Sequence, residues 1–194
     1  SSDLQSMNPS AADFITAFKE VNADDIFVLP NNGNIILTAK QAAELYKGSN
    51  IHVLESKTLG EGHAALTMLN LETDDPAAIE SDMRDAMQGV LTAAISTCSR
   101  DTNANGFNLY TGEYIGFSGD TILSADNDRV DTAKRLVDSL DFDSHEICVL
   151  ISGKDADEKE TEEIRNYITE KHPMCEIYDV DGGQSIYHYV LIVE

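Results

Sequence analysis

Short apolar runs rich in β-branched residues alternate with stretches of helical periodicity along this 194-residue chain. The runs at residues 26–29 and 51–54 have the composition of strands, and residues 39–47 between them have the pattern of a helix. A strand–helix–strand order favours parallel pairing, with the intervening helix packed on one face of the sheet. The alternation therefore predicts an α/β fold.

The rest of the chain continues this order, with an interruption after residue 100. Helices are expected at residues 11–21, 60–71, 130–140 and 158–171, and a long helix at residues 76–95. Strands are expected at residues 146–151, 175–180 and 187–193. Short strand candidates at residues 110–115 and 121–123 indicate a small β insertion. The expected architecture has two α/β lobes, residues 1–99 and 100–194, with mainly parallel sheets flanked by helices and the insertion near the start of the second lobe.

The composition is that of a folded protein. With 42% hydrophobic residues, the chain can bury one sizeable core or two small ones. It has no run of 18 apolar residues, and its polar first residues lack the basic and apolar regions of a signal peptide. We therefore expect a cytoplasmic protein without membrane insertion. The absence of an initiator Met suggests a piece of a longer protein.

Acidic residues outnumber basic residues by 35 to 13, which gives a formal net charge of −22. Phosphate backbones and anionic lipid surfaces repel a protein of this charge, so no nucleic-acid partner is expected. The charge is densest in residues 126–194. These acidic residues form either a solvated surface or a docking face for a basic partner.

The cysteines and histidines do not have the spacing of a metal site. Cys98, Cys148 and Cys175 are far apart and stand among apolar or small residues, so buried free thiols are expected. The five histidines are scattered, without an HExxH motif or a closely spaced pair. We therefore expect no structural or catalytic metal.

Amide side chains gather in the loop after the first predicted strand, at Asn31, Asn32 and Asn34. Loops at the carboxyl ends of parallel strands are where α/β folds bind ligands, and amides can donate hydrogen bonds to a carboxylate or phosphate. Asn residues also form turns through local hydrogen bonds, so both interpretations stay open. Gly62 and His63 begin a predicted helix after the next strand, where backbone N–H groups favour an anion. We expect both loops to face one crevice, although a partly buried, hydrogen-bonded His63 is an alternative.

Two further positions have a local and a ligand-binding interpretation. Ser10 precedes the helix predicted at residues 11–21, with Asp13 three residues later, which is the spacing of an N-cap in a near capping box. Its hydroxyl is alternatively a ligand contact. Arg100 and Asp101 form either a local ion pair or a turn lock. Arg100 is also the only basic residue in a long stretch of the chain, and an isolated positive charge in so acidic a protein favours an anionic partner.

Six motifs, in this order, carry a resemblance to a known family. They are Met7-Asn8-Pro9-Ser10, Leu29-Pro30-Asn31-Asn32-Gly33-Asn34-Ile35, Gly62-His63-Ala64-Ala65, Ser99-Arg100-Asp101, Gly112-Glu113-Tyr114-Ile115-Gly116 and Gly182-Gly183-Gln184-Ser185-Ile186-Tyr187. Together they are similar to the C-terminal region of the catalytic subunit of bacterial fatty acid kinase, a dihydroxyacetone-kinase-like protein. The resemblance implies that ATP and Mg²⁺ bind a separate N-terminal domain and that this chain holds no cofactor.

At the level of the fold, the resemblance extends to the DegV-type fatty-acid-binding proteins, which are the partner subunits in that system. It implies a two-lobed DegV-like architecture. Those proteins carry a Thr-Ser turn where this chain has Met7-Asn8, and a Ser-Ser loop where it has Asn31-Asn32, so the hydroxyls that would hold a carboxylate are replaced. Lipid binding is therefore expected to be altered or lost. The candidate ligand- or partner-binding residues are Asn8, Ser10, Asn31, Asn32, Asn34, Gly62, His63, Arg100 and Asp101.

Three classes of function compete. The favoured one is a non-catalytic module of a fatty acid kinase that recruits or positions a DegV-type fatty-acid-binding partner for ATP-dependent acyl phosphate formation. The second is a DegV-like domain that binds a small carboxylate, a phosphate or a lipid between its lobes. The third, a self-sufficient enzyme, is the least favoured, because no nucleophile–base pair or paired carboxylate can be placed in its expected context. A homodimer is also possible.

Overall fold

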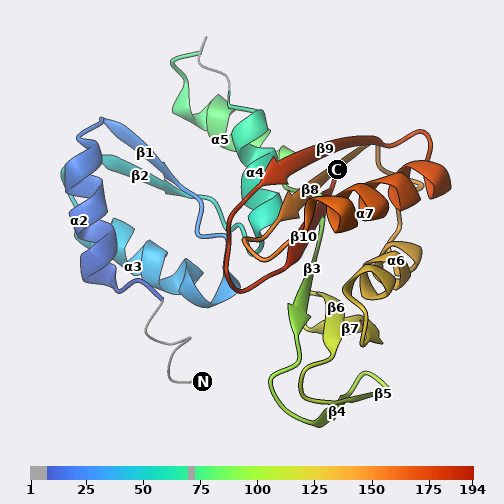
Figure 1. Ribbon diagram of the computed structural model, residues 1–194. Helices are drawn as coiled ribbons and strands as arrows, with labels where there is room; N and C mark the ends of the chain where they lie inside the picture. The colour runs from blue at the N-terminus through green and yellow to red at the C-terminus, as the bar shows by residue number, and fades with distance from the viewer. Residues whose placement is uncertain (1–7, 70–72) are drawn as a thin grey trace. The chain divides into compact units, whose positions relative to one another are not determined.

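Two parallel strands, β1 (Asp25–Val28) and β2 (Asn50–Val53), form the centre of the first of two structural units (Figure 1). The computed structural model describes residues 8–69 and 73–194. The units are Ser1–Gly89 and Val90–Glu194. The boundary falls between Gly89 and Val90, whereas the sequence places it between residues 99 and 100. The difference arises because β3 (Leu91–Thr97) belongs to the sheet of the second unit.

Helices cover both faces of the β1–β2 pair. They are α2 (Ala11–Val21), the short 3-10 helix η1 (Gly33–Ile35) followed by α3 (Ile36–Leu45), α4 (Leu59–Thr67) and α5 (Pro76–Ala86). Successive side chains of a strand point to opposite faces, so Ile26 and Val28 pack against α2 and α3. Phe27 lies on the other face, in a cluster with Ala65 of α4 and Met83 of α5. The unit is therefore a three-layer α/β structure built on a very small sheet.

The helix ends follow from local sequence. Ser10 Oγ accepts a hydrogen bond from the Asp13 N–H at 3.2 Å, and Asp13 Oδ2 accepts one from the Ser10 N–H at 2.8 Å. This confirms the predicted capping box of α2. The helix predicted at residues 76–95 is wrong, because α5 ends at Ala86 and Gly89 adopts a φ of +82°. The predicted helix 60–71 ends at residue 67, and residues 70–72 lie outside the described residues.

The second unit is built on a six-stranded sheet with the strand order β7-β6-β3-β10-β8-β9. Besides β3, its strands are β6 (Tyr114–Ser118), β7 (Thr121–Asp126), β8 (Ile147–Ser152), β9 (Glu176–Asp181) and β10 (Tyr189–Val193). Helices α6 (Arg129–Ser139) and α7 (Glu158–Lys171) pack against one face of this sheet. Leu136 and Ile164 of these helices meet Ile95, Leu150 and Leu191 of the sheet in a fully buried core.

The mixed α/β fold is confirmed, but the expectation of mainly parallel sheets is wrong for the second unit. Only the β8–β9 pair is parallel there, whereas β10 runs antiparallel to β3 and to β8, and β6 runs antiparallel to β3 and to β7. Parallel neighbours need a long crossover, which α7 provides between β8 and β9. The connections from β6 to β7 and from β9 to β10 contain no helix, so those strands reverse direction.

The predicted β insertion is only partly separate from the main sheet. Strands β6 and β7 belong to the six-stranded sheet, and only the hairpin of β4 (Thr102–Ala104) and β5 (Phe107–Leu109) forms a sheet of its own. Figure 1 shows this hairpin at the end of the second unit where β3 leaves the sheet. The three cysteines are buried and free, as expected. No helix in the described part of the chain is both long and apolar enough to cross a bilayer.

Candidate functional site

The loops that follow β1 and β2 meet at one edge of the small sheet. Asn31, in the loop after β1, has a φ of +55°, a conformation that Asn tolerates better than most residues. Its N–H donates a hydrogen bond of 3.0 Å to Oγ of Ser56, a buried side chain just after β2. Because β1 and β2 are parallel, both loops leave the same edge of the sheet, which is where the sequence places them.

Helix α4 begins against the Asn31 side chain. A Cβ atom on Gly62 would lie 1.9 Å from Asn31 Oδ1, so only glycine permits this contact without a shift. Asn31 Oδ1 is buried and accepts no hydrogen bond from the described residues. Thr58 caps the helix by accepting the Glu61 N–H at 3.2 Å. The first turn of α4 and the amide loop therefore form one packed structure.

The other predicted site residues of the first unit are less enclosed. Asn32 Oδ1 accepts the Asn34 N–H at 2.9 Å and caps η1, which is the turn-forming interpretation. Asn8 and Ser10 are exposed before α2, and His63 is half-buried on α4. Their part in binding a ligand or partner stays a prediction.

Arg100 and Asp101 lie in the second unit, at the base of the β4–β5 hairpin. Asp101 Oδ1 accepts hydrogen bonds from the N–H and hydroxyl of Thr111, at 2.7 and 2.8 Å. The backbone and hydroxyl bonds from Thr111 lower the pKa of the Asp101 carboxyl. This supports the turn-lock interpretation of Asp101. Arg100 is exposed, and within the described residues its guanidinium makes no ion pair.

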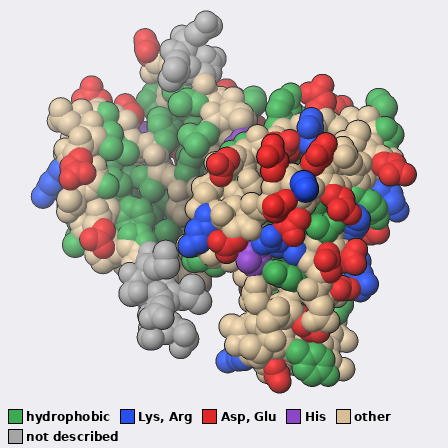
Figure 2. Space-filling model, viewed as in Figure 1, with side chains coloured by type: hydrophobic (Ala, Val, Ile, Leu, Met, Phe, Trp, Pro, Cys, Tyr) green, Lys and Arg blue, Asp and Glu red, His purple; other side chains and the backbone are tan. Residues whose placement is uncertain are grey.

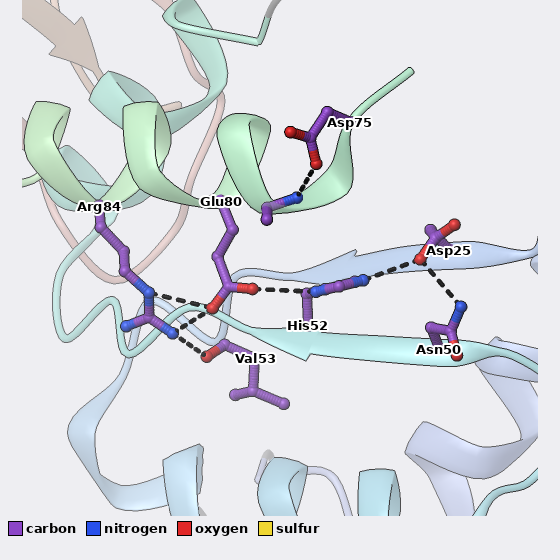
Figure 3. A network of polar contacts seen from close by, with 8 residues as sticks. Asp25, Asn50, His52, Val53, Asp75, Glu80 and Arg84 are labelled. Atoms are coloured by element: carbon purple, nitrogen blue, oxygen red, sulfur yellow. Dashed lines mark hydrogen bonds and ion pairs between the residues drawn. The ribbon is translucent and has the colours of Figure 1, made fainter. Parts of the chain in front are cut away.

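A polar network that the sequence analysis missed joins β1, β2 and α5 (Figure 3). His52 Nε2 lies 2.9 Å from Asp25 Oδ1, and its Nδ1 lies 2.9 Å from Glu80 Oε2. Arg84 donates to Glu80 Oε1 through Nε at 3.1 Å and Nη2 at 2.6 Å. The imidazole stacks on Phe27, with ring centroids 4.7 Å apart. Both ring nitrogens are engaged, so His52 ties α5 to the sheet and has no nitrogen left for catalysis.

The charges of this network favour one protonation state. Burial lowers the pKa of His52, but the hydrogen bonds to Asp25 and Glu80 outweigh it and raise the pKa above its ordinary value. The hydrogen bond from Arg84 is the main cause of a lowered pKa at Glu80, and that from His52 is the main cause at Asp25. The network is therefore an imidazolium held between two carboxylates.

A second missed network joins four elements at one edge of the six-stranded sheet. Arg129 Nη1 lies 3.3 Å from His188 Nδ1, and its Nη2 pairs with Glu160. His188 Nε2 lies 2.9 Å from Thr97 Oγ1. Because Arg129 can only donate, His188 accepts at Nδ1 and donates from Nε2 to Thr97. Burial, followed by the charge of Arg129, lowers the pKa of His188, which agrees with a neutral imidazole.

This edge carries features of an anion-binding site. Arg129 is the first residue of α6, its side chain is only 12% exposed, and its Nε makes no hydrogen bond within the described part of the chain. The rings of Tyr114 and Tyr189 lie 5.8 and 5.9 Å from the guanidinium carbon. Beside the network lies a groove of about 910 Å³ at the carboxyl ends of β8 and β9. Thr161, which bonds Tyr189 Oη at 3.0 Å, lines this groove. Glu160 already neutralises much of the Arg129 charge.

The two networks left only a weak signal in the sequence. His52 interrupts an apolar strand on the side that faces Phe27, and His188 directly precedes the last strand. Their partners Glu80 and Arg129 are 28 and 59 residues away, and no spacing rule connects them. Residues 8–69 and 73–194 contain no cluster of three or more His, Cys, Asp or Glu suited to a metal ion.

Comparison with known proteins agrees with the motif order. The chain is 33% identical over 190 residues to protein YloV of Bacillus subtilis, an alignment that covers 98% of this chain and 34% of YloV. It thus spans about a third of the length of the curated relatives it matches. A DegV family protein of Corynebacterium glutamicum has a similar fold, with a TM-score of 0.70, 13% identity and coverage of 96% and 82% of the two chains.

Two further solved structures share the fold at low identity. The Streptococcus pneumoniae fatty acid kinase (Fak) B3 protein loaded with linoleic acid has a TM-score of 0.69 and 15% identity, over 96% of this chain and 76% of its own. The dihydroxyacetone kinase of C. freundii has a TM-score of 0.64 and 14% identity, over 95% and 41%. The model of the FakA-like C-terminal family of fatty acid kinase matches residues 2–194. The chain therefore belongs to the family of FakA-like C-terminal domains of fatty acid kinase.

Proposed function

We propose that this chain is the module of a fatty acid kinase that recruits a DegV-type fatty-acid-binding protein and positions its acyl carboxylate for phosphorylation. In this proposal, ATP and Mg²⁺ bind a separate N-terminal domain of a longer, cytoplasmic protein. Family membership over residues 2–194 supports the link to the kinase, and the length of YloV is consistent with further domains. The DegV-like fold of the chain supports an ancestry shared with the proposed partner.

The packing of Asn31 against Gly62 is the observation that carries this proposal. In a fold shared with fatty-acid-binding proteins, the loops after β1 and β2 are a natural place for a carboxylate. Here Asn31 donates to Ser56, Asn32 caps η1, and Gly62 fills the space beside Asn31 with backbone. These polar groups are largely engaged by the chain itself. The loop therefore functions as a scaffold and not as a lipid site.

The charge of the chain suits an association steered by electrostatics. Figure 2 shows acidic side chains spread over the visible face of the second unit, with fewer Lys and Arg between them. Helix α7 contributes exposed Glu158, Glu162, Glu163 and Glu170. Opposite charges on a partner accelerate encounter, and a transient catalytic complex benefits more from a fast on-rate than from high affinity.

Surface plasmon resonance tests the proposal directly. The chain is immobilised, and each DegV-type protein encoded in the same genome is passed over it, loaded with oleate. We expect at least one of them to bind reversibly, with an on-rate that falls as the salt concentration rises. Bovine serum albumin loaded with oleate controls for capture through the lipid alone. If no DegV-type protein binds above this control, the recruiting role is wrong.

The Arg129–His188 edge favours a second candidate function, the binding of a small carboxylate or phosphate. A largely buried guanidinium with an unbonded Nε is a group that an anion would satisfy. Native mass spectrometry of the purified chain, with acetate, oleate and inorganic phosphate added in turn, tests this function. Retention of an anion by the wild type and its loss in Arg129→Gln would support it, and a bare mass in every case would contradict it.

A further inference from the structure

The β4–β5 hairpin and its flank lack charge in an otherwise highly charged chain. Residues 102–112 contain no Asp, Glu, Lys, Arg or His, whereas a quarter of all residues are charged. The two neighbouring carboxylates, Asp101 and Glu113, are engaged locally, because Asp101 accepts from Thr111 and Glu113 Oε2 accepts the Tyr110 N–H at 2.8 Å. The exposed surface of the hairpin is therefore neutral, with the exposed Arg100 at its base.

Hydrogen bonds hold the hairpin in one conformation. Cys98 exchanges two backbone bonds across the base, accepting the Gly112 N–H at 2.9 Å and donating to the Glu113 carbonyl at 2.7 Å. At the tip, Asn105 and Gly106 have φ values of +51° and +83°, as a two-residue type I′ turn requires. Asn105 Oδ1 accepts the Ile122 N–H of β7 at 2.8 Å. The hairpin is thus fixed at both ends before any partner binds.

The two faces of the hairpin differ in composition. Leu109 is 3% exposed and lies with Phe107 on the face that is turned inward. Asn103 and Asn108 pair across the strands on the other face, where Asn103 Nδ2 donates to Asn108 Oδ1 at 2.7 Å. Tyr110 follows on the same face by strand alternation and is 57% exposed. Tyr and Asn supply contact area and adaptable hydrogen bonds at low entropic cost, as in the binding loops of antibodies.

We infer that the Asn103–Asn108–Tyr110 face of the β4–β5 hairpin, with Arg100 beside it, is the surface that docks the DegV-type fatty-acid-binding protein. The inference rests on the proposed function. A neutral platform lets a partner with acidic surface groups approach a chain of net charge −22, and Arg100 supplies a guanidinium for a partner carboxylate. Rigidity before binding reduces the entropy lost on association.

The size of the hairpin favours this partner over a second copy of the chain. A substrate-carrying protein must leave after each phosphorylation, and transient complexes use small, polar interfaces, commonly below about 1,200 Å² in total. Three-residue strands and one exposed tyrosine suit such an interface. A stable homodimer needs a larger apolar surface than this hairpin offers.

The docking surface is tested by affinity measurements with the DegV-type protein that the wild-type chain binds, loaded with oleate. We expect Tyr110→Ala and Arg100→Ala each to weaken binding by about tenfold or more, as hot-spot residues do. Tyr178→Ala and Lys159→Ala are matched controls, because both residues are exposed in the same unit outside the hairpin. Circular dichroism spectra should be the same for all variants, since the Tyr110 N–H bond to Glu113 does not involve the tyrosine ring.

The outcomes separate this inference from the proposed function. Loss of affinity in the hairpin variants with unchanged controls supports the docking surface. Equal affinity in all variants overturns it while leaving the recruiting role intact, whereas absence of binding by the wild type overturns the recruiting role. If sedimentation shows a wild-type dimer that Tyr110→Ala dissociates, the hairpin is a self-association surface and the inference is wrong.

Discussion

His52 Nδ1 lies 2.9 Å from Glu80 Oε2, a contact that fastens helix α5 to strand β2. The imidazole is charged when it donates to Glu80 and Asp25 together, so the strength of this link depends on pH. The contact joins residues 28 positions apart and buries the ring against Phe27. It makes His52 the most informative position for testing the stability of the first unit.

The first prediction is that His52→Gln lowers the free energy of unfolding by about 1–3 kcal/mol at pH 5.5, because a charged hydrogen-bonding group is lost between two carboxylates. The pKa of His52 is raised on folding, so its contribution is complete below the ordinary pKa and is lost as pH rises through the folded pKa. The difference between wild type and variant should therefore shrink at pH 9. Urea denaturation at both pH values measures it, with Lys47→Gln as a control, and a difference independent of pH contradicts the prediction.

The second prediction concerns the contact between Gly62 and Asn31. Gly62→Ala should destabilise the chain by about 1–3 kcal/mol, because the new methyl group overlaps Asn31 Oδ1. In an Asn31→Gly background the same substitution should cost much less, since glycine removes the obstructing side chain and tolerates the φ of +55°. Gly33→Ala is the control, because a Cβ there meets nothing within 4 Å. Equal costs in both backgrounds would show that the overlap does not matter.

The third prediction is that the purified chain neither hydrolyses ATP nor transfers its phosphate. The reason is the expectation that the ATP-binding features belong to a separate domain. A colorimetric phosphate assay measures it, with the chain at micromolar concentration in MgCl₂ and with heat-denatured chain as the control. Phosphate release that co-purifies with the protein through size exclusion would contradict it.

The fourth prediction concerns the acidic face of α7. Glu162→Lys combined with Glu170→Lys should slow association with the DegV-type partner by about tenfold at low salt, since steering acts on the on-rate. Glu163 is left unchanged because it pairs with Lys134 at 2.6 Å. Both substituted residues are exposed, so the fold should persist. Association measured at two salt concentrations checks this, and an on-rate insensitive to charge and salt removes the acidic docking face while the kinase module remains possible.

Local signals in the sequence predicted much of the fold. The spacing of Ser10 and Asp13 located the start of α2, and the apolar periodicity of α7 gave the bounds that the structure has, residues 158–171. The direction of the strands was harder to predict, because it depends on which connections contain a helix. The helix predicted through residue 95 failed because apolar residues after Gly89 fit either a buried helix or a buried strand.

The candidate site divides along the same line. The meeting of the Asn31 and Gly62 loops followed from the parallel order of two neighbouring strands. The pairs His52–Glu80 and Arg129–His188 did not, because each depends on how a helix packs on a sheet. No local pattern in one sequence contains that information. The resemblance of the six motifs to the kinase family supplied what periodicity could not.

All three thiols lie in the second unit, at Cys98, Cys148 and Cys175, and none is more than 7% exposed. Burial raises the pKa of Cys148 to about 12, so almost no thiolate exists near neutral pH. An alkylating reagent therefore reacts with these sulfurs only when the six-stranded sheet opens. The chain thus carries a built-in probe for the unfolding of one unit, and the modification rate reports that event without any engineered label.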